Sequence, residues 1–184
     1  MKVLAVTGYK PMELNIFKHD DERIQFIKYA LKKRLVQYIE EGLEWVLISG
    51  QMGVELWTGE VVLDLKDIYS IQLAVIPPFE NMDQRWPEPQ QFAYQQLIIE
   101  ADFYKPLYKG EYKGPYQFRA MNQWLIEKSD GCLFLVDEDY PGSNRFLLDV
   151  AKSKDHYPIL TLTPADLEDA VLEWQMSDPR YWDS

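Results

Sequence analysis

Short apolar runs alternate with amphipathic segments along almost the whole chain. Each run is rich in Val, Ile and Leu and has few polar residues, which is typical of a strand buried on both faces of a sheet. The predicted strands are Val3–Thr7, Trp45–Ser49, Ile71–Ile76, Cys132–Asp137 and Ile159–Leu162. Strands that are separated by helices imply right-handed crossovers, so the pattern predicts an α/β protein with a mainly parallel sheet.

The segments between these runs carry apolar residues three and four positions apart, which is the spacing of one helical face. The clearest segment starts at Asp21, continues through Ile24, Ile27 and Leu31, and stops at Gly42. Glycine at such a position is a good helix terminator. Further helices are predicted around residues 54–65, 90–101, 146–150 and 164–174. One domain over residues 1–184 accounts for this pattern.

The stretch 77–116 is less regular than the rest of the chain. Residues 90–101 have a helical pattern, but the flanking segments 79–89 and 104–115 carry Pro, Gly and Tyr and are predicted to be long loops. Long loops in a compact domain are often lids or binding loops. We therefore interpret 77–116 as an insertion of loops and one helix that forms a candidate lid.

Three predicted strands are followed by turns that contain glycine. The turns are Thr7-Gly8-Tyr9-Lys10-Pro11, Ser49-Gly50-Gln51-Met52-Gly53 and Pro141-Gly142-Ser143-Asn144. The carboxyl ends of parallel strands border the ligand crevice of such folds. Glycine lets the backbone approach a ligand, and the helix behind it offers unpaired N–H groups and a positive dipole end. One such turn is ordinary turn chemistry, but three at the correct strand ends predict a phosphate cradle, with Ser49 and Ser143 as hydroxyl donors.

Arg119 is the candidate phosphate clamp. It shares a predicted helical face with Asn122, and an arginine beside a strand end can bind a phosphate bidentately. A surface ion pair with one of the 30 acidic residues is equally compatible with the spacing. Neither the Gly-Lys-Ser/Thr triplet nor the three-glycine dinucleotide pattern occurs. His19 and His156 lack metal-ligand spacing, so no metal site is expected.

The charge of the chain narrows the choice of partner. The formal net charge is -11 from 30 acidic and 19 basic residues, so a nucleic-acid partner is disfavoured, as is docking on an anionic membrane. The single cysteine, Cys132, cannot form an internal disulfide, which suits a reducing compartment. No apolar stretch approaches the length of a membrane span or a signal-peptide core. We therefore expect a cytoplasmic protein.

The order and spacing of these motifs resemble the SLOG superfamily, which includes the DprA and LOG proteins. The similarity is closest to the YpsA family of Firmicutes and covers nearly the whole chain. The motifs are Thr7-Gly8-x-Lys10-Pro11, Ser49-Gly50-x-x-Gly53, Pro78-Phe79, Gln84-x-Trp86, Ala101-Asp102, Arg119-x-x-Asn122, Ser129-Asp130-Gly131 and Pro141-Gly142-Ser143.

This resemblance implies a Rossmann-like, three-layer α/β/α fold whose glycine-rich strand ends bind nucleotides or nucleotide derivatives. Together with the turn argument, it identifies a set of candidate ligand-binding residues. They are Thr7, Gly8, Lys10, Ser49, Gly50, Gly53, Arg119, Asn122, Gly142, Ser143 and Asn144.

The resemblance also raises an enzymatic alternative. LOG enzymes cleave the N-glycosidic bond of nucleoside monophosphates with an arginine and a glutamate that follows a Gly-Gly-x-Gly-Thr stretch. This chain has Pro141-Gly142-Ser143-Asn144 there, with Asp149 near the position of that glutamate. The catalytic residue is therefore unknown, with Glu55 and Asp149 as candidates.

Three hypotheses remain open at this level. The first is a binding or sensing module for a nucleotide derivative, such as an ADP-ribose- or NAD-like molecule, without a required cofactor. A bulky residue at Gly53 should then abolish binding and leave the fold intact. The second adds a protein partner, with the aromatic stretches Trp86–Tyr116 and Trp174–Trp182 as candidate surfaces. The third is the N-glycosidic hydrolase. Both a monomer and a homodimer are compatible with the sequence.

Overall fold

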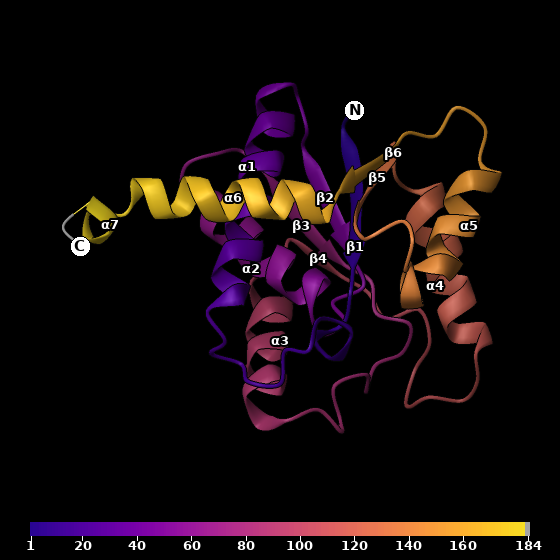
Figure 1. Ribbon diagram of the computed structural model, residues 1–184. Coiled ribbons are helices and arrows are strands. Elements are labelled where there is room, and N and C mark those ends of the chain that lie inside the picture. The colour runs from indigo at the N-terminus through magenta and orange to yellow at the C-terminus, as the bar shows by residue number, and fades with distance from the viewer. Residues whose placement is uncertain (183–184) are drawn as a thin grey trace.

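The five predicted apolar runs form strands of one parallel sheet (Figure 1). The computed structural model describes residues 1–182, and the side chains of residues up to 180. Each run lies within two residues of its predicted bounds. The strands are β1 (Val3–Gly8), β2 (Trp45–Ile48), β3 (Gln72–Val75), β4 (Phe103–Tyr104), β5 (Gly131–Leu135) and β6 (Ile159–Leu162).

The strand β4 was not predicted from the sequence. It has two residues and pairs in parallel with β3 through Ala74 and Val75; its second residue, Tyr104, begins the segment predicted to be a loop. Two residues cannot show a periodic pattern, so only the pairing with β3 makes this segment a strand.

The sheet order β4-β3-β2-β1-β5-β6 places the topological switch between β1 and β5. The chain first adds strands outward from β1 to β4, and then returns to the other side of β1. In open parallel sheets, the ligand crevice lies beyond the carboxyl ends of the strands at this switch. The turns after β1 and β5 therefore face each other across it.

The predicted helices are present with their expected start and stop signals. The long amphipathic segment ends just before Gly42, and the helix that starts at Pro164 has Thr163 as its N-cap and Asp166 in a capping box. The helices are α1 (Arg23–Glu40), α2 (Val54–Leu65), α3 (Glu88–Glu100), α4 (Tyr116–Glu127), α5 (Arg145–Ser153), α6 (Pro164–Ser177) and α7 (Pro179–Trp182), with 3-10 turns η1 (Pro11–Leu14) and η2 (Gly142–Asn144).

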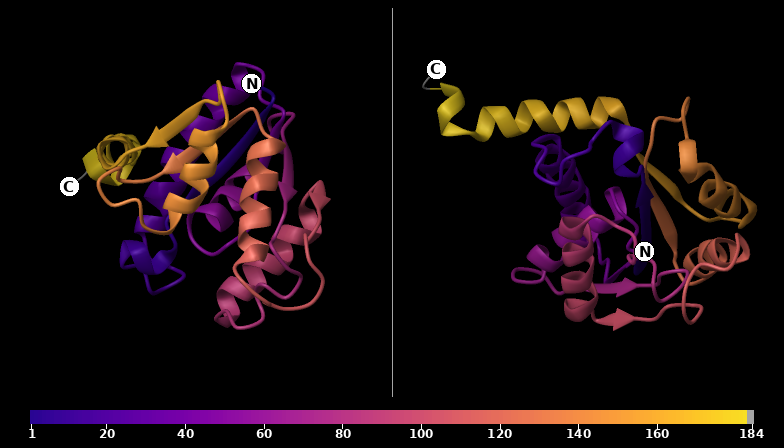
Figure 2. Two further views of the ribbon diagram at one scale, coloured as in Figure 1. Left: turned by 90° about the vertical axis from the view of Figure 1, so that its right-hand side faces the viewer. Right: turned by 90° about the horizontal axis from the view of Figure 1, so that it is seen from below.

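Alternate strand residues contribute to two cores, one on each face of the sheet. In β1, Leu4 and Val6 pack with α1, α2 and α3, whereas Ala5 packs with α4 and α5. Figures 1 and 2 show these two groups of helices on opposite sides of the sheet. The predicted three-layer α/β/α arrangement is thus confirmed. Helix α6 packs on α1 and extends with α7 beyond the rest of the chain.

The stretch 77–116 is more integrated into the fold than a loop insertion would be. Helix α3 packs on α2 and buries Tyr94 and Leu97, and β4 extends the sheet. Within this stretch, only Tyr112 and Pro115, which follow β4, line the cavity at the switch point. Within residues 1–182, no helix is long and apolar enough to cross a membrane.

Candidate functional site

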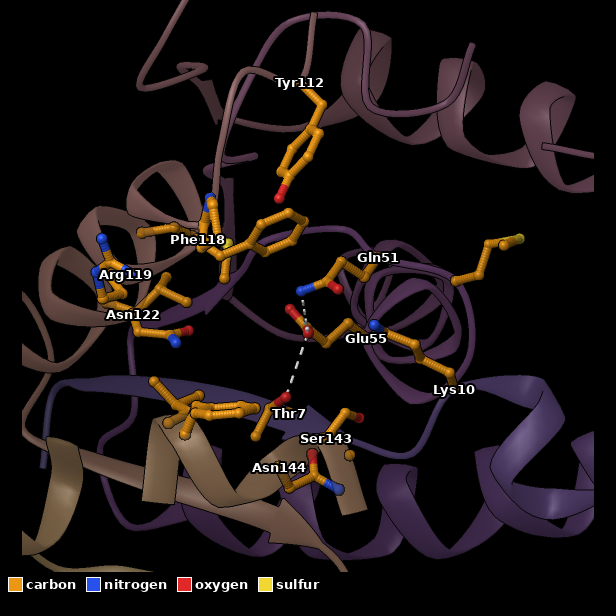
Figure 3. Close-up of a pocket in the computed structure, with 17 residues that line it drawn as sticks. Thr7, Lys10, Gln51, Glu55, Tyr112, Phe118, Arg119, Asn122, Ser143 and Asn144 are labelled. Atoms are coloured by element: carbon orange, nitrogen blue, oxygen red, sulfur yellow. Dashed lines mark hydrogen bonds between the residues drawn. The ribbon is translucent and has the colours of Figure 1, made fainter. Parts of the chain in front are cut away.

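A cavity of about 360 Å³ lies at the switch point, beyond the carboxyl ends of β1 and β5 (Figure 3). Its volume falls in the range of small-molecule sites. Its walls come from the end of β1, the start of α2, helix α4 and the turn before α5. The lining residues are Thr7, Gly8, Lys10, Gln51, Met52, Glu55, Tyr112, Pro115, Phe118, Arg119, Met121, Asn122, Leu125, Ser143, Asn144, Phe146 and Leu147.

Most of the candidate residues from the sequence line this cavity. Those that line it are Thr7, Gly8, Lys10, Glu55, Arg119, Asn122, Ser143 and Asn144; those that do not are Ser49, Gly50, Gly53, Gly142 and Asp149. Asp149 is an exposed residue of α5 and is not among the residues that line the cavity. Of the two catalytic candidates, the structure places only Glu55 at the cavity.

The Ser49 donors are directed at Glu55 and not at the cavity. The backbone N–H of Ser49 lies 2.7 Å from Glu55 Oε1, and the Ser49 hydroxyl lies 2.6 Å from the same oxygen. Ser49 is fully buried. In this structure, the acceptor of the Ser49 hydroxyl is thus a residue in the first turn of α2, six positions further along the chain; its predicted contact with a ligand phosphate stays a prediction.

Glu55 is a buried acid in the cavity wall. It is 5% exposed, and its Oε2 accepts a hydrogen bond from the Thr7 hydroxyl at 3.2 Å. Burial raises the pKa of Glu55, although the hydrogen bonds from Ser49 and Thr7 and the charge of Lys10 act in the opposite direction. A buried acid with a raised pKa in a cavity is a recognised mark of a functional site, though ion-pair networks also produce it.

The Ser143 donors also have an acceptor within the chain. Ser143 donates its backbone N–H to Glu13 Oε2 at 3.1 Å and its hydroxyl to Glu13 Oε1 at 2.6 Å. The backbone N–H of Lys10 donates to Oε1 as well, at 3.0 Å. Desolvation acts to raise the pKa of Glu13, but these hydrogen bonds outweigh it and lower the pKa below its ordinary value. Ser143 also lines the cavity, and its predicted role as a hydroxyl donor to a ligand stays a prediction.

Other donors at the cavity lack acceptors among the described residues. The amide nitrogen of Asn144 is buried without a hydrogen-bond partner, and the residue is 3% exposed. The ammonium of Lys10 and the guanidinium of Arg119 form no ion pair within the described chain. In Figure 3, Arg119 and Asn122 lie on one side of the cavity, and Lys10 lies on the other.

An apolar wall completes the cavity, and sequence reasoning missed it. Phe118, Met121 and Leu125 recur on α4 at the spacing that also presents Arg119 and Asn122. That spacing is the signal that could have identified them. Helix α5 adds Phe146 and Leu147, and the loop before α4 adds Tyr112 and Pro115. Of the candidate lid 77–116, only this last part lines the cavity. The aromatic rings of this wall, those of Tyr112, Phe118 and Phe146, can stack on a planar ring of a ligand.

Tyr9 joins the two turns that meet at the switch point. The backbone N–H of Asp137 donates to the Tyr9 hydroxyl at 2.9 Å, and that hydroxyl donates to the carbonyl of Tyr140. The turn after β1 is thereby held against the loop after β5. In the motif taken from the sequence, this position is only a spacer, so its partner could not be predicted.

Comparison with known proteins supports the resemblance. The family model described as "YspA SLOG family" matches residues 4–167. A UPF0398 protein of Oceanobacillus iheyensis is 58% identical over 184 residues, covering all of both chains. The UPF0398 protein YpsA of Bacillus subtilis is 46% identical over 177 residues, covering 94% of this chain and 98% of that protein.

A solved structure shares the fold. It is the structure of DNA processing protein A from Helicobacter pylori, reported for its single-stranded DNA binding mode. The TM-score is 0.58 at 14% identity, over 96% of this chain and 74% of that chain. At this identity, the likeness concerns the fold alone, and it confirms the Rossmann-like class predicted from the sequence. With its family model matched from β1 into α6 and full-length relatives at 46–58% identity, the chain belongs to the YpsA family of SLOG proteins.

Proposed function

We propose that the cavity binds a nucleotide or a nucleotide derivative, a class that includes AMP, ADP-ribose and NAD, and that the protein acts as a binding or sensing module. The observation that carries this proposal is the pairing of two unlike surfaces in one cavity. Two cationic groups that form no ion pair within the described residues, those of Lys10 and Arg119, share the cavity with a wall built around Phe118 and Phe146.

A nucleotide has groups that match both surfaces of the cavity. Its phosphate and ribose oxygens can accept hydrogen bonds from the cationic and amide groups, and its base offers a flat ring to the aromatic wall. Stacking of a base on an aromatic ring contributes about 1–3 kcal/mol in single-strand binding proteins.

A free nucleotide fits this chain better than a DNA strand. The structural neighbour binds single-stranded DNA, but strand affinity depends mainly on many cationic contacts to phosphates. This chain carries a net charge of -11. One cavity with two cations suits a small ligand, so we expect no appreciable binding of an oligonucleotide at physiological salt.

Action through a protein partner is part of the same proposal. Tyr112 lines the cavity and is 53% exposed, so a ligand against its ring would also alter the outer surface. The other candidate surface is less available, because Trp174 packs edge-on against Phe26 and Tyr29. The side chains at positions 181 and 182 of that surface lie outside the described residues. The proposal needs no cofactor and accommodates a monomer or a homodimer.

N-glycosidic hydrolysis of a nucleoside monophosphate is the second candidate. The observation in its favour is Glu55, a buried carboxyl whose pKa is raised and whose side chain lines the cavity. In its ionised form, such a group would stabilise positive charge that develops on a sugar carbon, and in its neutral form it could donate a proton to the leaving base. Its Oε1 accepts two hydrogen bonds from Ser49 and its Oε2 accepts one from Thr7, so a substrate would have to approach Oε2 beside the Thr7 hydroxyl.

A thermal-shift screen followed by chromatography tests both candidates. The panel contains AMP, ADP, ATP, NAD, ADP-ribose, cyclic dinucleotides and a single-stranded oligonucleotide. We expect at least one small nucleotide to raise the unfolding midpoint and to be recovered intact, because a ligand that binds only the folded state stabilises it. Release of free base would favour the hydrolase. No shift with any compound would contradict the proposed function.

The variant Arg119→Gln is expected to weaken binding of the best nucleotide by roughly 10- to 100-fold, because a charge-assisted hydrogen bond is worth about 1.5–3 kcal/mol. The matched control is Lys32→Gln, which removes one positive charge from the exposed face of α1, away from the cavity. Calorimetric titration of the wild type and both variants measures the effect. If the control weakens binding equally, then the overall charge of the protein, and not a clamp at Arg119, determines affinity.

A further inference from the structure

A second hollow, of about 380 Å³, shares Tyr112 with the cavity at the switch point. Its apolar lining comes from Phe79, Met82 and Trp86 together with Tyr112. Phe79 and Met82 are buried, at 7% and 9% exposure, so this lining is anchored in the body of the protein. The second hollow is therefore a neighbour of the cavity and offers aromatic surface of its own.

Three aromatic rings form the wall between the two spaces. Phe79 lines the second hollow, Phe118 lines the cavity, and Tyr112 lines both. The ring centroids lie 5.8 Å apart for Phe79 and Tyr112, 6.0 Å for Phe79 and Phe118, and 6.1 Å for Tyr112 and Phe118. Figure 3 shows Tyr112 extending from its loop toward Phe118. Because Tyr112 is 53% exposed, a ligand that passes beside its exposed edge can contact both spaces.

The backbone around the second hollow is held by hydrogen bonds between two segments that are distant in sequence. The N–H of Glu80 donates to the carbonyl of Tyr108 at 3.1 Å, and the N–H of Asn81 donates to the carbonyl of Gly110 at 3.0 Å. The motifs Pro78-Phe79 and Gln84-x-Trp86, for which the cavity has no role, meet at this place. The second hollow is thus formed by paired backbone before any ligand arrives.

The polar groups of the second hollow suit a nucleobase better than a phosphate. Asn81 and Gln84 offer amide groups, and Arg85 and Glu111 add one charge of each sign. Neither of these charged groups forms an ion pair within the described residues. Proteins recognise unpaired bases by stacking on aromatic side chains and by hydrogen bonds to the base edges. The two cations of the cavity are the better partners for phosphate.

We propose that the second hollow is a subsite of the same binding site and holds the second base of a dinucleotide, a ligand in which two nucleosides are joined through phosphates. The first base lies against Phe118, the phosphates lie near Lys10 and Arg119, and the second base lies against Trp86 and Tyr112. This inference rests on the proposed function and narrows it to ligands with two ring systems. Each space alone is at the lower end of the range for small-molecule sites, about 300 to 1,000 Å³, so two subsites match a two-part ligand.

Diadenosine diphosphate and ADP-ribose are a matched pair of probes for this subsite. They carry the same diphosphate and differ only in the adenine on the second ribose. For the wild type, we expect calorimetric titration to show about tenfold tighter binding of diadenosine diphosphate, equivalent to about 1.4 kcal/mol. That gain lies within the range for stacking of one base on an aromatic side chain, about 1–3 kcal/mol.

Two variants assign this gain to the second hollow. Trp86→Ala should remove most of it, and Arg85→Ala should reduce it about threefold, because a guanidinium can stack on a base or donate to its edge. Neither variant should change the affinity for ADP-ribose. The control Lys109→Ala removes an exposed positive charge that lines neither space, and should leave the gain unchanged. Trp86 packs edge-on against Tyr94, with ring centroids 5.1 Å apart, so unfolding midpoints are measured for each variant. If Trp86→Ala is not folded, Arg85→Ala decides the question.

The possible outcomes separate the two proposals. If the wild type binds both probes equally, or if the gain survives in both folded variants, the second subsite is refuted while nucleotide binding stands. An equal loss in Lys109→Ala also refutes it, because overall charge then explains the result. If neither probe binds but another nucleotide of the panel does, the dinucleotide inference fails alone. If no nucleotide binds at all, the proposed function fails, and the inference fails with it.

Discussion

Replacement of Gly53 by alanine is expected to lower the free energy of unfolding by about 3 kcal/mol, from backbone strain and overpacking together. Gly53 has a φ of +95°, in a region that residues with a side chain rarely adopt. A Cβ there would overlap the carbonyl oxygen of Tyr9 and lie 2.9 Å from Lys10 Cα. That neighbour is backbone, so it cannot rotate away as a side chain would.

The same replacement should also weaken ligand binding. The backbone N–H of Val54, at the start of α2, donates to the Tyr9 carbonyl at 3.1 Å, so the turn after β1 packs directly against the backbone at Gly53. Displacement of that turn moves Lys10 out of the cavity wall. The structure therefore alters the expectation from the sequence, in which a bulky residue at Gly53 removes binding but leaves the fold intact.

Urea denaturation of Gly53→Ala and Gly110→Ala measures this effect. Gly110 is a matched control, because it also has a positive φ, +77°, but an added Cβ would meet nothing within 4 Å. Its replacement should cost only about 1 kcal/mol, the conformational penalty alone. In thermal unfolding, we expect the Tm of Gly53→Ala to fall by roughly 6–12 °C in a chain of this size. Equal losses in the two variants would show that contact with Tyr9 is unimportant.

Replacement of Glu55 by alanine is expected to cost about 3 kcal/mol, whereas replacement by glutamine should change stability by less than about 1 kcal/mol at neutral pH. Alanine leaves the Ser49 N–H, the Ser49 hydroxyl and the Thr7 hydroxyl without their acceptor in a buried place. Glutamine keeps a carbonyl oxygen for the Ser49 donors. The loss in Glu55→Ala would be contradicted by a free energy of unfolding close to that of Glu55→Gln.

The pH dependence provides a separate check on Glu55. Because burial raises the pKa of this carboxyl above 4.5 in the folded state, its ionisation is more costly there than in the unfolded chain. The stability that it contributes is full below that unfolded value and is lost as the pH rises through the folded pKa. Glu55→Gln has no such loss, so its stability relative to the wild type should increase with pH.

Urea denaturation from about pH 5.5 to about pH 8.5 measures that difference. A constant difference between the wild type and Glu55→Gln would mean that Glu55 does not titrate in this range. The same variant separates the two candidate functions. If the wild type releases a base from a nucleotide, then Glu55→Gln should lose that release while remaining folded; if the nucleotide only binds, the variant should still bind it.

The strands and most helices could be predicted because burial on both faces is visible in local composition. The run Val3–Thr7 has almost no polar residue and becomes β1, and the spacing from Ile24 to Leu35 becomes the buried face of α1. The strand β4 could not be predicted, because its two residues carry no periodicity and depend on pairing with β3.

Part of the site could be predicted for a similar reason. A parallel sheet brings every carboxyl strand end to the same edge, so turns that are distant in sequence must meet there. Lys10 and Asn144 lie after β1 and β5, and both line the cavity. Asp149 was a candidate on motif position alone, and its place on the exposed side of α5 depends on how that helix packs.

The sequence by itself determined the fold class and the glycine turns at the strand ends, because these follow from short-range patterns and from the topology of a parallel sheet. Only the tertiary structure decided which acceptors occupy the serine donors. Ser143 is engaged by Glu13, 130 residues earlier, and Ser49 by Glu55 in the next helix. The apolar wall around Tyr112 and Phe118 was decided in the same way. Glu13 and Ser143 meet only when the strands assemble, so their spacing along the chain does not predict the contact.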